Sequence, residues 1–260
     1  MSESSKKQES LATVIMAAGM GTRMKRPDLA KVMFELRGKP LVHYVADFAR
    51  AIGSERIVAI VGYQRERVME YLQRTHPGIL YVVQEPQLGT GHAVMQTEAA
   101  LNDFSGSVLV LSGDVPLLQP QTMETMLQLH RSSGAVATML TADLEDPSGY
   151  GRVIRNGSGI VEKIVEHRDA SPDELQQREI NSGIYLFKKE RLFDGLKHLT
   201  PHNAQNEYYL TDVFAYFWKQ RWTVAAFKAP NADEIQGINT VEQLEQAQRI
   251  LDTRQRATAQ

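Results

Sequence analysis

Short apolar segments that alternate with amphipathic segments constrain the fold of this chain more than any other feature. Three apolar runs end in turns that contain glycine, and they lack the alternation of a half-exposed strand: Thr13–Ala17, Arg56–Val61 and Ser107–Leu111. Such runs are typical of strands that are buried on both faces of a parallel sheet. Apolar spacing predicts helices at Leu41–Ile52, Arg65–Arg74 and Gly91–Leu101. The order strand, helix, strand therefore predicts an α/β fold with a Rossmann-like, doubly wound sheet.

The pattern changes at about residue 134. From there, candidate strands follow one another with few helices between them: Ala135–Thr141, Gly151–Arg155, Ile160–Glu166 and Ser182–Phe187. This succession predicts a mixed-sheet extension of the first part. We expect three further elements to close the fold, namely a helix at Tyr208–Lys219, a strand at Thr223–Phe227 and a helix at Thr240–Asp252.

Composition argues against several classes of protein. A formal net charge of −2 gives no basic field that would hold nucleic acid or an acidic membrane. The chain has no cysteine, so disulfides and thiolate metal sites are excluded. The first ten residues are polar and lack the core of a signal peptide, and no apolar run approaches membrane-spanning length. We therefore expect a cytoplasmic protein that binds neither nucleic acid nor membranes.

A glycine-rich turn at residues 17–24, AAGMGTRM, directly follows the first predicted strand. Glycines let backbone N–H groups cradle phosphate oxygens, and the guanidinium of Arg23 can grip two oxygens at once. A dinucleotide fingerprint would need a third glycine where Met24 stands and an acidic residue about 20 residues further on. A P-loop would need Gly-Lys-Ser/Thr, which does not follow. The turn therefore predicts phosphate binding, with a purely structural turn as the alternative.

Two charged residues are candidates for the chemistry of phosphates. Asp114 falls just beyond a buried strand, where open α/β sheets bind ligands and where a carboxylate can hold Mg²⁺. An aspartate that merely ends the strand is an equal alternative. Lys31 could return to the phosphates that Arg23 binds, although its spacing alone favours a solvated surface lysine.

The other polar clusters are less specific. Gln84–His92 joins a strand to a helix through Gly-Thr-Gly, and its amide and backbone groups suit the edge of a nucleobase as well as a simple turn. Ser148–Arg152 and Glu166–Asp169 are compatible with a site or with solvated loops. The spacing of the seven histidines indicates no metal site, and no Ser/His/Asp arrangement stands out.

Taken in order, these segments resemble the motifs of the sugar-1-phosphate nucleotidyltransferases. The branch that they match is the uridylyltransferase (pyrophosphorylase) domain of the bifunctional bacterial GlmU enzymes, and the similarity covers about Thr13–Leu251. The matching motifs are AAGxGTRM at 17–24, QLGTGHA at 87–93, GDVPL at 113–117, GYGR at 149–152, IVEHxDA at 164–170, EINSG at 179–183, NAQxEYYLTD at 203–212 and GxN at 237–239.

The resemblance implies a role for each matching residue. It implies a nucleotide-diphospho-sugar transferase fold in which Arg23 and Lys31 are the catalytic cations and Asp114 and Asn239 hold Mg²⁺. The implied nucleotide contacts are Ala18, Gly19, Gly21, Thr22, Gln84, Gly89, Thr90 and Gly113. The implied amino-sugar contacts are Gly151, Glu166, Asn181, Tyr209 and Thr211.

The implied reaction converts UTP and N-acetylglucosamine 1-phosphate into UDP-N-acetylglucosamine and pyrophosphate. There are two alternatives. The chain could be a nucleotidyltransferase for another sugar phosphate, or a non-catalytic module that binds a nucleotide sugar. We expect a single domain over residues 11–252, with a nucleotide-binding part at about 11–133 and a sugar-binding part at about 134–239. Residues 1–10 are expected to be a disordered tail and residues 253–260 a C-terminal tail. A monomer or weak dimer is expected.

The chain departs from the family pattern in three places. Ala30 stands where the family usually has proline, and Arg26-Pro27 resembles a one-residue insertion, so the placement of Lys31 could differ. Ser112 replaces a residue that is often aromatic. The family's hexapeptide-repeat domain, which transfers acetyl groups, has no counterpart in this sequence, so acetyl transfer is not expected.

Overall fold

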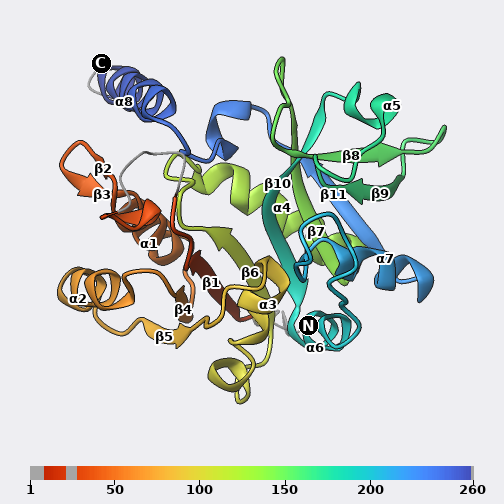
Figure 1. Cartoon of the computed structure of the whole chain (residues 1–260), viewed down its shortest axis with the longest axis horizontal. Helices are drawn as coiled ribbons and strands as arrows, with labels where there is room; N and C mark the ends of the chain where they lie inside the picture. Colours follow the sequence, from red (N-terminus) through yellow and green to blue (C-terminus); the bar gives the residue numbers. More distant parts are fainter. Residues whose placement is uncertain (1–8, 22–27, 259–260) are drawn as a thin grey trace, which may run out of the picture.

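A mixed sheet forms the centre of the fold in this computed structural model, which describes residues 9–21 and 28–258 (Figure 1). Within those residues the sheet has nine strands, and its main path runs β11-β7-β10-β6-β1-β4-β5. These strands are β1 (Leu11–Ala17), β4 (Arg56–Val61), β5 (Leu80–Val83), β6 (Ser107–Ser112), β7 (Ala137–Asp143), β10 (Glu179–Lys188) and β11 (Val224–Lys228). β8 (Gly151–Arg155) and β9 (Val161–Val165) form a hairpin beside β10.

Most strands of the main path are parallel to their neighbours. β1 pairs in parallel with β4 and β6, β4 with β5, and β11 with β7. β10 is the exception, because it runs antiparallel to β6, β7 and β8. The predicted α/β fold with a Rossmann-like, mostly parallel mixed sheet is confirmed.

Helices cover both faces of the sheet. One face carries α1 (Leu41–Ala51), α2 (Arg65–Thr75) and α4 (Pro120–Ser133), and the other carries α3 (Thr90–Met95), α6 (Lys189–Leu196) and α7 (Asp212–Lys219). In β1, Ile15 packs into the first core and Val14 into the second, and both are fully buried. Burial on both faces explains why the strand sequences are continuously apolar instead of alternating.

The last helix packs against a short hairpin that precedes α1. The hairpin of β2 (Glu35–Leu36) and β3 (Lys39–Pro40) contributes Leu36 to a small third core, in which Ala247 of α8 (Val241–Thr258) is also buried. α8 and this hairpin lie at one side of the molecule in Figure 1, and the β8–β9 hairpin lies at the other. The remaining elements are short: η2 (Lys31–Met33), η3 (Ala99–Leu101), α5 (Pro172–Leu175) and η4 (Ala232–Ile235).

Several observed elements differ from the predicted ones. The helix predicted at Tyr208–Lys219 begins only at Asp212, and the strand predicted at Ser182–Phe187 begins earlier, at Glu179. The helix predicted at Gly91–Leu101 stops at Met95, where the Thr97 hydroxyl donates to the Val94 carbonyl (2.7 Å) and a turn leads to η3. The last helix continues six residues beyond the predicted end, to Thr258 rather than Asp252. α4 and α6 were not predicted, although α4 has the usual boundaries of proline at its start and left-handed Gly134 at its end.

The order of the strands places the site. β1 and β6 are neighbours, but the chain proceeds from β1 to β4 on one side and from β6 to β7 on the other. Loops that diverge in this way leave a crevice at the carboxyl ends of the two strands, which is where such sheets bind ligands. The glycine-rich turn and Asp114 follow these two ends. Among the helices that the structure describes, none is both long and apolar enough to cross a membrane.

Candidate active site

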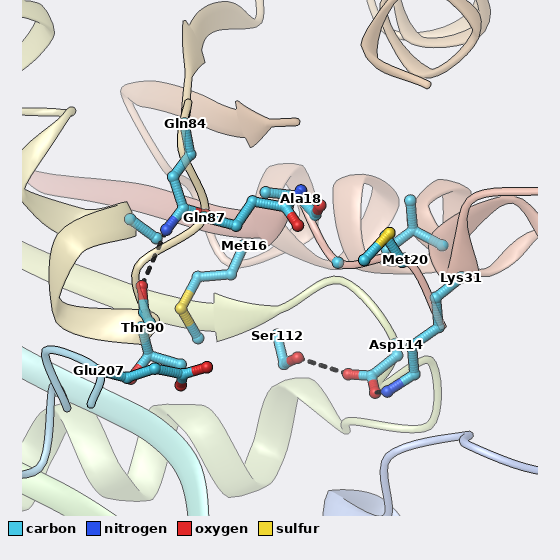
Figure 2. A pocket seen from close by; sticks show the side chains of 14 residues that line it. Met16, Ala18, Met20, Lys31, Gln84, Gln87, Thr90, Ser112, Asp114 and Glu207 are labelled. Carbon is cyan, nitrogen blue, oxygen red and sulfur yellow. Dashed lines mark hydrogen bonds and ion pairs between the residues drawn. The ribbon is translucent and has the colours of Figure 1, made fainter. Parts of the chain in front are cut away.

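A cavity of about 410 Å³ lies at the carboxyl ends of β1 and β6. Figure 2 shows Gln84, Gln87 and Ala18 together at one end and Lys31 with Asp114 at the other. The predicted site residues that line this cavity are Ala18, Gly19, Lys31, Gln84, Gly89, Thr90 and Asp114. The first loop after β1, the loop after β5 and the loop after β6 therefore meet around one space.

Two glutamine amides fix the walls of this cavity. Gln84 Nε2 donates to the carbonyl of Gly89 (2.9 Å), which holds the loop after β5 in shape (Figure 2). Gln87 Nε2 donates to the carbonyl of Ala18 (2.5 Å), which ties that loop to the glycine-rich turn. Gly89 has a φ of +100°, and a Cβ there would lie 2.7 Å from the Tyr208 carbonyl oxygen. Only glycine fits this backbone, because the segment at Tyr208 is pressed against it.

A second cavity of about 230 Å³ adjoins the first. It is lined by the remaining predicted residues that the structure brings together, which are Gly151, Glu166, Asn181, Thr211 and Asn239. Asp114 lines both cavities, as do its neighbour Ser112 and Thr90. The site is therefore one bipartite space with Asp114 at the junction.

An irregularity in β10 aims Asn181 into the second cavity. The pairing of β10 with β7 shifts between Asn181 and Tyr185, and Gly183 within this bulge has a φ of +78°. The bulge is held by Ser182, whose hydroxyl donates to the Leu140 carbonyl (2.6 Å). Asn181 Nδ2 donates to the buried Tyr185 hydroxyl (2.6 Å), which fixes the amide. Bulges next to sites re-aim side chains in this manner.

Glu166 and Thr211 form the polar pair of the second cavity. The Thr211 hydroxyl donates to Glu166 Oε1 (3.1 Å) from the segment that leads into α7. Burial raises the pKa of the Glu166 carboxyl; the Thr211 hydrogen bond lowers it, and the charges of Asp212 and Asp169 raise it. A carboxyl in this setting can accept hydrogen bonds from the hydroxyl or amide groups of a sugar, and it does so better once ionised.

The oxygens at the junction converge on a cation. The ammonium of Lys31 forms an ion pair with Asp114 Oδ2 and donates to Asn239 Oδ1 (2.6 Å). Ser112 donates to the other oxygen of Asp114 (2.5 Å), which orients the carboxylate (Figure 2). A carboxylate and an amide oxygen that already share one cation are a donor set that fits Mg²⁺, which prefers oxygen ligands.

Comparison with known proteins agrees with this geometry. The sequence profile of the family described as "Nucleotidyl transferase" matches residues 12–233. The chain belongs to the nucleotidyl transferase family.

Within this family, the chain is similar to bifunctional GlmU proteins. The bifunctional protein GlmU of Pelotomaculum thermopropionicum is 47% identical over 245 residues, which are 94% of this chain and 52% of the relative. That of Geobacillus thermodenitrificans is 47% identical over 241 residues, 93% of this chain and 52% of the relative. The chain thus spans about half the length of these relatives.

Solved structures show the same fold. A UDP-glucose pyrophosphorylase complexed with UDP-glucose matches with a TM-score of 0.73 and 19% identity, over 94% of this chain and 99% of the other. A putative glucose-1-phosphate thymidylyltransferase from Bacillus anthracis, in complex with a sucrose, matches with a TM-score of 0.75 and 19% identity, over 93% of this chain and 95% of the other. The fold is that of nucleotide-diphospho-sugar transferases.

Not every residue predicted for this nucleotidyl transferase lines the site. Among the described residues, Gly21, Gly113 and Tyr209 line neither cavity. A Cβ at Gly21 would lie 2.6 Å from Lys31 Cβ, and one at Gly113 would lie 2.9 Å from Val32 Cγ1. Both glycines therefore allow the turn that carries Lys31 to pack closely. The predicted residues Thr22 and Arg23 lie outside the described residues.

The departure from the family pattern at Ala30 has a structural counterpart. The backbone N–H of Ala30, which proline would lack, donates to Gln64 Oε1 (3.0 Å). Gln64 Nε2 donates in turn to the Asp28 carbonyl (2.6 Å). Gln64 therefore holds the segment before Lys31 by its backbone, and Lys31 still reaches Asp114.

Several lining residues were not predicted from the sequence. Gln87 and Glu207 line the first cavity and stand inside two of the quoted motifs, so the motifs could have indicated them. Ser112 was noted only as a departure, yet it holds Asp114. Met16, at the end of β1, lines both cavities and carries no signal in the sequence beyond that of a buried strand.

Proposed function

We propose that this chain joins UTP to N-acetylglucosamine 1-phosphate in the presence of Mg²⁺, releasing UDP-N-acetylglucosamine and pyrophosphate. The observation that carries the proposal is the bipartite site, in which two adjoining cavities share Asp114. One cavity has the phosphate turn and the amide groups that suit a nucleotide, and the other has the polar side chains that suit a sugar. The sequence identity to GlmU proteins supports this choice of substrates.

The reaction requires positioning and charge neutralisation more than a protein nucleophile. A phosphate oxygen of the sugar phosphate attacks the α-phosphorus of UTP, a new P–O bond forms, and the bond to the β-phosphate breaks to release pyrophosphate. Because the attacking oxygen is already an anion, no side chain has to remove a proton. Lys31 and Arg23 supply positive charge to the triphosphate, and in-line placement of the two substrates lowers the barrier.

Asp114 and Asn239 would hold the Mg²⁺ ion. When bound, Mg²⁺ neutralises the charge that develops on the phosphate oxygens. Ser112 keeps the Asp114 carboxylate oriented through its 2.5 Å hydrogen bond. The cation site favours catalysis over simple binding, because a nucleotide-sugar-binding module needs no metal at the boundary between its two cavities.

The second cavity accounts for the choice of sugar. Asn181, Glu166 and Thr211 offer donors and acceptors to hydroxyl and amide groups, and Asn181 is buried and fixed by Tyr185. A smaller sugar would leave such groups unpaired, which discriminates more than the loss of a methyl group, worth only about 1–3 kcal/mol. We therefore assign the residues from about 134 to 239 mainly to the sugar and those from about 11 to 133 mainly to the nucleotide.

Release of pyrophosphate from UTP, Mg²⁺ and N-acetylglucosamine 1-phosphate tests the proposal. We expect kcat/KM for this sugar phosphate to exceed the values for glucosamine 1-phosphate and glucose 1-phosphate by at least about tenfold. EDTA should abolish turnover. Equal values for glucose 1-phosphate would discard the assigned sugar but keep a nucleotidyltransferase. Binding of UDP-N-acetylglucosamine without release of pyrophosphate from any sugar phosphate would indicate a binding module.

We also propose that the chain acts in the cytoplasm as a monomer or weak dimer. The oligomeric state is supported by the two cavities, whose lining residues all come from one chain. Light scattering at working concentrations tests the oligomeric state, and a stable higher oligomer would overturn it.

A further inference from the structure

Two helices on the first face of the sheet bring a histidine–aspartate–histidine cluster together. His43 and Asp47 lie one turn apart on α1, and His76 directly follows α2. Asp47 Oδ1 lies 2.9 Å from His76 Nε2, and Asp47 Oδ2 lies 3.2 Å from His43 Nε2. All three potential ligand atoms lie within 4.8 Å of one another. Sequence spacing did not indicate this cluster, because His76 comes from a different helix.

The imidazole of His76 is held at its other ring nitrogen. The Thr75 hydroxyl lies 2.8 Å from His76 Nδ1 and 2.8 Å from the Tyr71 carbonyl oxygen. This contact orients the ring with Nε2 directed at Asp47.

His43 is held in the same manner on the other side of Asp47. Its Nδ1 lies 3.1 Å from the Tyr71 hydroxyl, which leaves Nε2 directed at Asp47. A hydrogen bond at one ring nitrogen is the usual support of a histidine that binds metal through the other.

We infer that His43, Asp47 and His76 form a binding site for a Zn²⁺-class divalent ion that links α1 to the end of α2. Zinc ligands lie about 2.0–2.2 Å from the ion, so tetrahedral ligand atoms stand about 3.3–3.6 Å apart. The observed N···O distances of 2.9 Å and 3.2 Å would have to lengthen by only a few tenths of an ångström to admit the ion. Two imidazoles and one carboxylate suit zinc better than magnesium.

The surroundings fit a three-ligand site with an open position. The His76 side chain is 1% exposed, whereas that of Asp47 is 57% exposed, so the ion would enter and keep a water on the Asp47 side. None of the three residues lines either cavity of the candidate active site. The site is therefore expected to act on the stability of the α1–α2 pair and not on the transfer reaction.

Zinc titration of the metal-stripped chain tests the inference. The protein is the Asp114→Asn variant, freed of bound metal and then kept in excess Mg²⁺, so that the active-site oxygens do not compete with the cluster for Zn²⁺. ZnCl₂ is then added during calorimetry. We expect one Zn²⁺ per chain, a rise in the unfolding temperature and, with Co²⁺ as the probe, the visible absorption of a tetrahedral ion. Asp47→Asn should weaken binding about a hundredfold or more, since loss of a supporting group alone weakens binding 10- to 100-fold.

Asp103→Asn is the matched control. Asp103 is also an exposed aspartate that pairs with a cation, Arg56, and its side chain is 78% exposed. This variant should bind Zn²⁺ like its parent. Because His76 is buried and its variants could unfold, Asp47→Asn carries the test, with circular dichroism as a check of folding. Absence of stoichiometric Zn²⁺ binding, or equal binding by Asp47→Asn, would overturn the metal site.

Discussion

The nucleotide half and the sugar half of the site are built from different groups of the chain, the first from backbone turns and the second from side chains. The nucleotide half is shaped by backbone turns, such as the one at Gly89, and its glutamines bind backbone carbonyls. The sugar half is lined by side chains from β10 and from the loops after β9 and before α7, as the bond between Thr211 and Glu166 shows. The first half therefore depends on backbone conformation, whereas the second depends on side-chain identity.

This contrast has a direct consequence for substitutions. In the nucleotide half, a change that alters the path of the backbone should disturb UTP binding even when no side chain contacts the ligand. In the sugar half, a change that keeps the backbone but removes one polar atom should alter only the sugar phosphate. Asp114 lies at the junction and should affect both.

The largest effect is expected for Asp114→Asn. The substitution keeps the size of the side chain but removes the charge that pairs with Lys31 and that would hold Mg²⁺. Loss of one well-placed electrostatic contact costs on the order of 3 kcal/mol, so kcat should fall roughly a hundredfold or more. Steady-state kinetics at saturating Mg²⁺ check this. A near-normal kcat would contradict the assignment of Asp114 as a Mg²⁺ ligand. It would also show that catalysis does not depend on the residue shared by the two halves.

Gly89→Ala should have the next largest effect, and it should fall on the nucleotide. Its φ of +100° and its closeness to the Tyr208 carbonyl mean that a methyl group must shift the loop after β5. We expect the KM for UTP to rise by about tenfold to a hundredfold, or about 1.4–3 kcal/mol. Kinetics with each substrate varied in turn provide the measurement.

Gly78→Ala is the matched control for that substitution. Gly78 has a similar φ of +92°, but a Cβ there meets nothing within 4 Å. It should therefore lower stability by about 1–3 kcal/mol through backbone strain without changing the KM for UTP. If both variants raised this KM equally, strain and not the packing at Tyr208 would be responsible.

The same contrast explains what the sequence could and could not predict. The strands at Arg56–Val61 and Gly151–Arg155 were predicted with the bounds that are observed, because local apolar runs determine them. The place of Asp114 followed from the rule for parallel sheets. In contrast, apart from the motif in which Glu207 stands, nothing local in the sequence shows that this residue closes the nucleotide cavity, since that contact depends on the path of the whole chain.

The sugar half was predicted from motif resemblance more than from physics. Asn181 is directed into the cavity by a bulge that depends on Ser182 and Gly183, and a bulge is not visible in a period-2 pattern. Tyr209 stands in a matching motif but does not line either cavity, and its hydroxyl accepts a hydrogen bond from Gln205 (2.9 Å). Its predicted contact with the sugar stays a prediction.

A smaller effect, confined to the sugar, is expected for Thr211→Val. The substitution keeps the shape of the side chain but removes the hydroxyl that donates to Glu166. Hydrogen bonds to charged groups contribute about 1.5–3 kcal/mol, so the KM for the sugar phosphate should rise about tenfold or more while that for UTP stays unchanged. Thr211→Ser, which retains the hydroxyl, should restore most of the loss. An equal rise in both KM values would show that the halves are coupled through α7.

The smallest effect concerns the dependence of sugar binding on pH. Burial raises the pKa of Glu166, so this carboxyl holds its proton to a higher pH than an exposed glutamate does. Below that pKa the carboxyl is neutral and accepts hydrogen bonds poorly; as the pH rises through it, the carboxylate forms. The KM for the sugar phosphate should therefore fall with rising pH, by about two- to tenfold for one hydrogen bond.

Both substrates also carry phosphates that ionise near pH 6. Glu166→Gln separates the two contributions, because it keeps the phosphate ionisation and removes that of the carboxyl. The profile for the sugar phosphate should flatten in Glu166→Gln while the profile for UTP keeps its shape. Identical sugar-phosphate profiles in the parent and the variant would remove Glu166 from the sugar contacts and leave Asn181 and Thr211 to define that half of the site.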